Sequence, residues 1–133
     1  MAGLTATSSL NVTKGTVKNK DGKQGNLDHV PPTYGRVGIA YENAQLQAEM
    51  YSIFNGWKKI ADYRLGAEDN EQYATPAGMP AWWTLNVKTS YALTKNLTLQ
   101  AGVENIMGIQ YLVFASGIHA AGRNVYGTLR ARF

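Results

Sequence analysis

Two histidines and a tyrosine are the side chains of this sequence best suited to holding an iron-containing ligand. His29, Tyr111 and His119 lie in segments without regular periodicity, and Asp28 precedes the first of them. Imidazole and phenolate groups are usual partners of iron in chelates and in haem. The sequence therefore indicates His29, Tyr111 and His119 as candidate ligand-binding residues in outer loops. The alternative is that these loop side chains are only solvated.

Nothing else in the sequence indicates catalysis. Glu68, Asp69 and Glu71 share one irregular segment, where nothing fixes the separation that general acid–base chemistry needs. The chain has no cysteine, which excludes disulfides, thiolate metal sites and a cysteine nucleophile. No helix is expected after Gly22–Gly25, so this segment does not predict a phosphate site. We predict a protein that is not an enzyme and has no catalytic residue, no metal site and no cofactor.

The charge of the chain is modest and dispersed. The formal net charge is +4, and charged residues make up 17% of the sequence, against about a quarter in typical soluble domains. No basic cluster is interleaved with aromatic residues, so no nucleic-acid partner is expected. No apolar run approaches the roughly 18 residues that a membrane helix needs. Met1 to Leu10 also lack the pattern of a signal peptide, and we expect the chain to derive from something longer.

The carboxyl-terminal segment alternates between apolar and polar residues. Because successive side chains of a strand point to opposite sides, Val125, Gly127, Leu129, Ala131 and Phe133 share one face. The other face carries Asn124, Tyr126, Thr128, Arg130 and Arg132. An apolar face, an opposite face with two arginines and a terminal aromatic residue are typical of the closing strand of an outer-membrane β-barrel.

The same period recurs along the chain. It predicts six antiparallel strands near residues 4–14, 34–42, 46–56, 83–93, 97–106 and 123–132, with little or no helix. Strands of about 9–11 residues are long enough to cross a bilayer when tilted. The predicted fold class is therefore all-β, an antiparallel six-stranded meander that forms the closing portion of a transmembrane β-barrel.

The predicted connections alternate between long and short. Residues 18–32, with an Asp21-Gly22 turn, and the irregular segments 58–80 and 108–121 are long. The turns at 42–45 and 94–96 are short. Membrane barrels sort their connections in this way, with short turns on the periplasmic side and long loops outside.

The apolar face of the predicted strands is expected to contact lipid. Its residues are Val37, Ile39, Trp83, Leu85, Val87, Leu97, Leu99, Val103, Val125 and Leu129. The opposite face carries charges that we expect to pair along a wet inner wall, namely Arg36, Glu49, Lys88, Glu104, Arg130 and Arg132. On that face we also expect Thr84, Asn86 and Thr128 to tolerate a charge. Two alternatives remain: a soluble β-barrel ligand-binding module of the lipocalin type, with its apolar face inward, and an assembly piece that recruits other chains through its strand edges.

Several motifs resemble those of one family. Tyr91 to Ile106 (YALTKNLTLQAGVENI) resembles the penultimate hairpin of TonB-dependent outer-membrane receptors. Gly122 to Tyr126 and the terminal Phe133 are similar to the closing strand of that family, and His29 to Gly38 is similar to the start of an earlier strand. The resemblance spans residues 29 to 133 in order. Met107-Gly108 departs from it, because the family tends to have an aromatic residue and an aspartate there.

The resemblance implies a protein of the outer membrane of a Gram-negative bacterium. Such receptors have barrels of about 22 strands with a plug domain, so residues 1–133 would be a partial C-terminal barrel domain without the plug and about sixteen upstream strands. It implies energised uptake of a scarce extracellular ligand (siderophore, haem, cobalamin or glycan), with TonB and the barrel-assembly machinery as partners of the full-length receptor. Phe133 would belong to the assembly signal. The isolated chain, with open strand edges and no lipid, is expected to self-associate.

Overall fold

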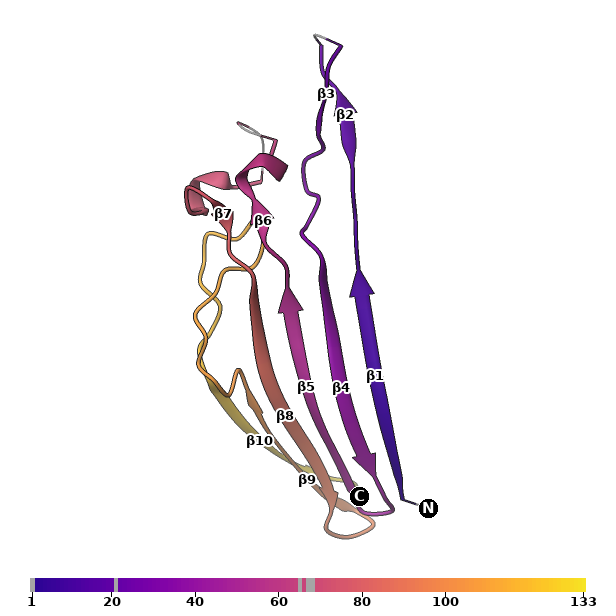
Figure 1. The fold of residues 1–133 in the computed structure, drawn as a ribbon. Helices are drawn as coiled ribbons and strands as arrows, with labels where there is room; N and C mark the ends of the chain where they lie inside the picture. The colour runs from indigo at the N-terminus through magenta and orange to yellow at the C-terminus, as the bar shows by residue number, and fades with distance from the viewer. Residues whose placement is uncertain (1, 21, 65, 67–68) are drawn as a thin grey trace.

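A single curved sheet dominates the computed structural model, which describes residues 2–20, 22–64, 66 and 69–133. Figure 1 shows its long strands side by side, in the order β1-β4-β5-β8-β9-β10. All neighbouring pairs are antiparallel. The strands are β1 (Gly3–Asn11), β4 (Tyr34–Glu42), β5 (Leu46–Asn55), β8 (Trp82–Ala92), β9 (Leu97–Glu104) and β10 (Asn124–Ala131).

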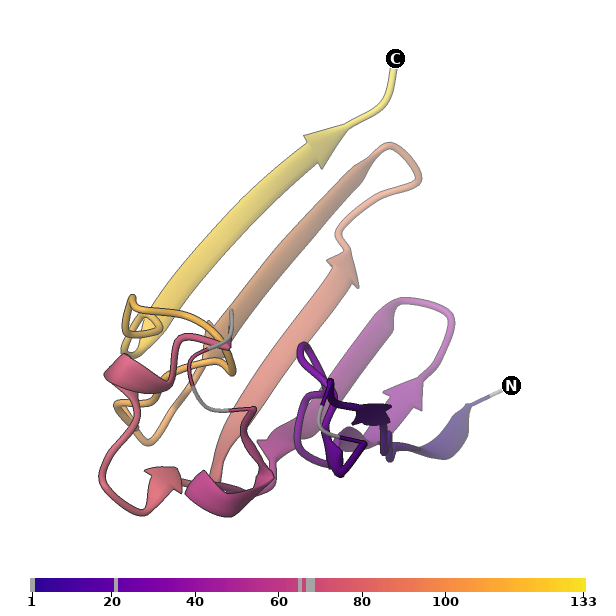
Figure 2. The ribbon, with the colours of Figure 1, turned by 90° about the horizontal axis from the view of Figure 1, so that it is seen from above.

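This architecture confirms the predicted meander of six antiparallel strands. The main difference is at the first strand, which ends at Asn11 rather than near residue 14. There the pairing of β1 with β4 stops, because Tyr34, the partner of Asn11, is the first residue of β4. Seen from above, the sheet bends like a segment of a cylinder wall, and both termini lie at the far end of the strands (Figure 2).

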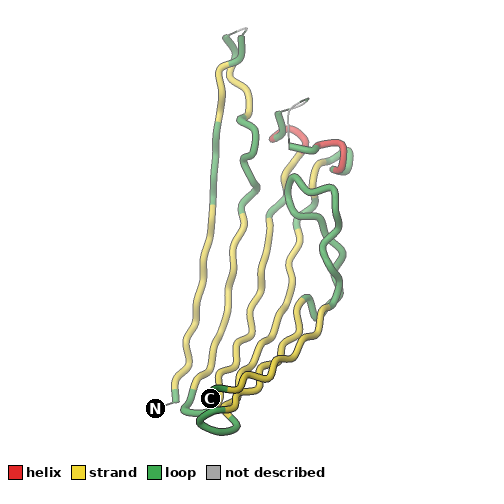
Figure 3. Tube along the Cα trace, turned by 180° about the vertical axis from the view of Figure 1, so that it is seen from behind, coloured by secondary structure: helices red, strands yellow, loops and turns green. Residues whose placement is uncertain are grey.

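The connections alternate in length as predicted, and Figure 3 shows the long loops gathered at one end of the sheet. At the other end, the β4–β5 turn is closed by the side chain of Asn43, whose Oδ1 accepts hydrogen bonds from the backbone N–H groups of Gln45 and Leu46 at 2.9 and 2.8 Å. In the β8–β9 turn, the N–H of Asn96 donates to Thr94 Oγ1 at 3.2 Å. Short polar side chains that satisfy the backbone locally explain why these turns are so tight.

Two long loops contain more regular structure than their composition predicted. The first holds the hairpin of β2 (Thr16–Lys18) and β3 (Gln24–Asn26), and the second pairs β6 (Lys58–Lys59) with β7 (Gly78–Met79). Asp21 of the predicted turn lies outside the described residues, whereas Gly22 has the positive φ of 82° that such a turn favours. The helices described are two short 3₁₀ segments, η1 (Ile60–Asp62) and η2 (Glu71–Tyr73). None of the described helices is long and apolar enough to cross a membrane.

Burial in this chain is the reverse of that in a soluble domain. Among the described residues, the buried hydrophobic ones are Tyr63 and Met79, and both lie in the second long loop. Buried polar residues are more numerous. They are Asn55, Lys58, Asp69, Thr84, Asn86 and Asn105. Large apolar side chains of the strands are instead exposed, such as Ile39 at 56% and Leu129 at 63%.

One glycine is required by close packing between strands. Gly35 of β4 lies opposite Phe54 of β5 and beside the first strand. A Cβ atom at this position would collide with the backbone carbonyl oxygen of Ser9 and with the Phe54 ring. Gly127 of β10 is the contrasting case, since a Cβ there would meet only the Gln100 carbonyl oxygen, at 3.9 Å.

We therefore expect Gly35→Ala to destabilise the full-length protein by about 1–3 kcal/mol, the usual cost of overpacking. The extra methyl group must push β1 away from β4 because a backbone atom cannot rotate aside. Thermal or urea unfolding of the purified protein measures the effect, and Gly127→Ala is the matched control. Equal stability of the two variants would show that β1 is not packed as described.

Candidate functional site: two sheet faces and a loop cap

One face of the sheet is apolar across all the long strands. Directly opposed residues of antiparallel neighbours project to the same side, so the register identifies the members of this face. Val87 of β8 is paired with Met50 and with Val103, and Val103 is in turn paired with Val125. By the same rule all ten residues predicted to face lipid share this face. They are Val37, Ile39, Trp83, Leu85, Val87, Leu97, Leu99, Val103, Val125 and Leu129.

The opposite face carries a charge cluster centred on Glu49 of β5. Its carboxylate is bonded to the guanidinium of Arg36 on β4 and lies 2.9 Å from Lys88 Nζ on β8. The Tyr51 ring packs under the same cations, with the Arg36 guanidinium carbon 4.2 Å from its centroid. The predicted pairing of Arg36, Glu49 and Lys88 along a polar wall is therefore observed. A single carboxylate between two cations leaves this part of the wall with a positive balance.

The other predicted charges of this face lie towards its two ends. Glu104 accepts a hydrogen bond from Asn124 Nδ2 at 3.2 Å, near the long loops. Arg130 and Arg132 border a hollow near the short turns. The polar face thus offers charged and hydrogen-bonding groups along its whole length.

A network of asparagines joins this face to the third long loop. Asn86 of β8 donates from Nδ2 to the Tyr51 carbonyl oxygen at 3.2 Å and to Thr84 Oγ1 at 3.1 Å. Its Oδ1 accepts from the backbone N–H of Asn105 at 2.8 Å. Asn105 has a φ of 48° and donates from Nδ2 to the Ile109 carbonyl oxygen at 2.8 Å, which turns the chain out of β9. Asn105 was not among the predicted site residues, although it lies in the family-like segment Tyr91 to Ile106.

These contacts correct one expectation. Thr84 and Asn86 were expected to tolerate a charge because they face the polar side, but they are only 3% and 4% exposed. Since each takes part in the buried network, a charge at either position would lose hydrogen bonds and lack solvation. The exposed Thr128 on β10 keeps its predicted tolerance.

The second and third long loops pack together around a small cluster of side chains, which we call the loop cap. Its members are Lys58, Tyr63, Asp69, Met79 and Phe114. Lys58 is 4% exposed, and its Nζ donates to the Val30 carbonyl oxygen at 2.7 Å. The same Nζ lies 5.4 and 5.1 Å from the ring centroids of Tyr63 and Phe114. One buried ammonium group thereby connects the first, second and third long loops.

Burial lowers the pKa of the Lys58 amino group, and the nearby carboxylates of Asp69 and Asp62 oppose this shift. Burial also raises the pKa of the Tyr63 hydroxyl. The Lys58 amino group binds its proton more tightly in the unfolded chain than in the folded loop. The stability of the fold therefore rises with pH between the folded pKa of Lys58 and the ordinary value of 10.5. The Tyr63 hydroxyl has the opposite effect, because it keeps its proton longer in the folded loop, so stability falls once pH passes the ordinary value of 10.0.

Asp69 joins the first loop to this cap. It is 1% exposed, and its Oδ1 accepts a hydrogen bond of 2.7 Å from the backbone N–H of His29. The imidazole Nδ1 of His29 lies 3.6 Å from the same oxygen. His29 has a φ of 58°, so the chain turns sharply to bring both groups to one carboxylate. Asp69, predicted to lie in an irregular segment where nothing fixes its position, is thus held by the first long loop. Glu68 of the same segment lies outside the described residues.

The predicted ligand-binding residues occupy two separate places. Tyr111 stacks on Trp82 with ring centroids 3.9 Å apart, at the loop end of the polar face. His119 is exposed and forms an isolated β-bridge with Leu112, and Ala120 N–H donates to the Tyr111 carbonyl oxygen at 2.9 Å. Tyr111 and His119 are therefore on one loop, whereas His29 contacts Asp69 of the second long loop. Within the described part of the chain, no group of three or more His, Cys, Asp or Glu is placed to hold a metal ion.

A sheet with one exposed apolar face and an opposite face that carries an ion-paired charge cluster and a hydrogen-bonded asparagine network is typical of the wall of a membrane β-barrel. The family model described as "TonB dependent receptor-like, beta-barrel" matches residues 2–106. The chain therefore belongs to this family of outer-membrane β-barrels.

A solved structure agrees with this assignment. The chain superimposes on the copper transporter OprC with a TM-score of 0.78 and 20% sequence identity. The match covers 98% of this chain but only 20% of the transporter, so the fold described here corresponds to one part of such a barrel. No curated protein matches the chain.

The two faces give a direct prediction. In the full-length receptor, Leu85→Arg or Leu99→Arg should block membrane insertion, because an arginine on the lipid face costs about 2–4 kcal/mol near the bilayer midplane. Thr128→Arg, on the polar face of β10, is the control and should insert normally. The fraction of folded barrel is measured from outer-membrane preparations by the shift in gel mobility between unheated and heated samples. If Thr128→Arg failed as severely as Leu85→Arg, the assignment of the faces would be wrong.

Proposed function

We propose that this chain forms part of the barrel wall of a TonB-dependent receptor that takes up a scarce extracellular ligand across the outer membrane. The observation that carries the proposal is the pairing of a continuous apolar face with a charged polar face in one sheet. The apolar face contacts lipid, and the Arg36–Glu49–Lys88 cluster faces the interior. TonB supplies the energy through the full-length receptor, and the barrel-assembly machinery inserts it.

Several ligand classes fit such a receptor: a siderophore, haem, cobalamin, a glycan, or copper as in the transporter named above. His29, Tyr111 and His119 are the candidate contacts in the long loops. Of these, Tyr111 has the most suitable position, since its stack on Trp82 presents an aromatic surface beside the polar wall. Tyr111 and Glu104 border one hollow of the polar face, and the exposed carboxylate of Glu104 adds a hydrogen-bonding group there.

The test is uptake by cells that express the full-length receptor. Labelled ferric siderophore, haem, cobalamin, oligosaccharide and copper should each be offered to cells with and without functional TonB. We expect one of them to accumulate only when both receptor and TonB are present, and Tyr111→Ala to reduce that uptake by more than Thr128→Ala does. Uptake that persists without TonB would contradict the proposal.

Phe133 is proposed to act in assembly. It is fully exposed, at 116% of its reference area, and follows the exposed Val125 and Leu129 of β10 in period two. The candidate ligand contacts are all in the long loops, and Figure 2 shows the C-terminus at the other end of the strands. Deleting Phe133 from the full-length receptor should therefore slow its appearance in the outer membrane without changing ligand affinity. Pulse-chase fractionation measures this, and normal kinetics would contradict the assignment.

A further inference from the structure

A small hollow lies on the outer side of the second long loop, just beyond the apolar face. It is lined by Trp57, Lys59, Ile60, Ala61 and Ala77, so Lys59 supplies its one charge. In the β6–β7 pair, Lys58 and Met79 face each other and are buried in the loop cap. Lys59 is the next residue of β6, so its side chain projects to the opposite side, away from the cap.

The Lys59 side chain is uncovered, and the indole beside it is held in place by a hydrogen bond. The residue opposite it is Gly78, which has no side chain to cover the hollow. Trp57 is 48% exposed, and its Nε1 donates to the Ala77 carbonyl oxygen at 3.2 Å, which fixes the indole at the rim. Among the described residues, no carboxylate forms an ion pair with Lys59.

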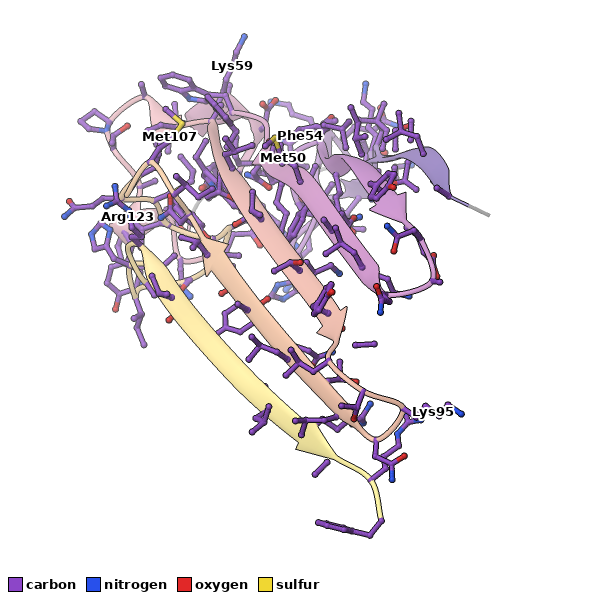
Figure 4. The ribbon with its side chains drawn as sticks, turned by 90° about the horizontal axis from the view of Figure 1, so that it is seen from below. Met50, Phe54, Lys59, Lys95, Met107 and Arg123 are labelled. Carbon is purple, nitrogen blue, oxygen red and sulfur yellow. The ribbon has the colours of Figure 1, made fainter. Side chains whose placement is uncertain are left out.

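The hollow continues the lipid-facing surface. Figure 4 shows Lys59 projecting from the loop end of the sheet on the same side as Met50 and Phe54, whereas Lys95 lies at the opposite end, in the β8–β9 turn. Phe54 is paired with Trp83 on the apolar face. An aromatic row followed by a tryptophan and a lysine is the order expected where hydrocarbon gives way to headgroups.

We propose that Trp57 and Lys59 form a site for the phosphorylated headgroup of an outer-leaflet lipid. The Lys59 ammonium group pairs with a lipid phosphate, Trp57 lies at the level of the headgroup, and the alanines and Ile60 contact the start of an acyl chain. Charge complementarity and continuity with the apolar face both favour a lipid over a soluble anion, because a soluble anion would gain nothing from the apolar lining. This inference rests on the lipid-facing assignment made under the proposed function.

The experiment uses the purified full-length receptor in detergent and diphosphoryl lipid A as the probe. Native mass spectrometry measures the fraction of receptor with bound lipid at several lipid concentrations. Lys59→Gln should weaken lipid binding about fivefold, the factor expected for one basic residue at an anionic lipid surface, and Trp57→Ala should weaken it further. Lys95→Gln is the matched control and should bind as the wild type does.

Three results would overturn the proposal. They are equal binding by Lys59→Gln and wild type, equal binding of a lipid A preparation without phosphates, and full competition by millimolar inorganic phosphate, which would indicate a site for a free anion. The barrel must also remain folded in every variant, as shown by its heat-modifiable mobility. A normally inserted barrel in which Lys59→Gln has no effect would therefore reject the lipid site alone and leave the proposed function standing.

Discussion

Backbone hydrogen bonding in hydrocarbon is the constraint on which the rest of this structure depends. An unpaired N–H or C=O group in the bilayer core costs several kcal/mol, so each strand that enters the membrane needs a partner on both sides. β4, β5, β8 and β9 have two partners, while β1 and β10 have one each in this chain. Their outer edges can be satisfied only by further strands. This agrees with a match that covers 20% of a larger transporter.

Once pairing is fixed, the period of two decides the chemistry of both faces. A one-residue slip of β8 against β5 would place Lys88 among lipid tails and remove it from Glu49. The Glu49 cluster therefore fixes the register from the polar side as the apolar row fixes it from the other. The exposed apolar and buried polar side chains are explained in the same way, because a protein surrounded by lipid has an apolar outer surface and its hydrogen-bonded groups inside. A soluble module of the lipocalin type would require the opposite arrangement.

The sequence predicted the strands and their faces well because both depend on local alternation. Leu85, Val87 and Leu99 could be assigned to one face from their spacing alone. The loops were predicted poorly because their structure depends on pairs that are distant in sequence, such as Lys58 with Val30 or Asp69 with His29. The tolerance expected at Asn86 was wrong for the same reason. The alternation of apolar and polar residues predicts which face Asn86 lies on. It does not predict the hydrogen bond that Asn86 accepts from Asn105, nineteen residues further along the chain.

The strands and the loops are thus adapted to different surroundings, the strands to lipid and the loops to water. The strands expose apolar groups to lipid and need little internal core, whereas the loop cap faces water and hides its own core of Tyr63, Met79 and the Lys58 stem. The desolvated ammonium group of Lys58 is retained because a carbonyl oxygen and two aromatic rings receive it. The boundary between the two regimes falls at Gly56–Lys59. Trp57 and Lys59 point outward there, on either side of the inward-facing Lys58, and the proposed headgroup site therefore lies directly beyond the apolar wall.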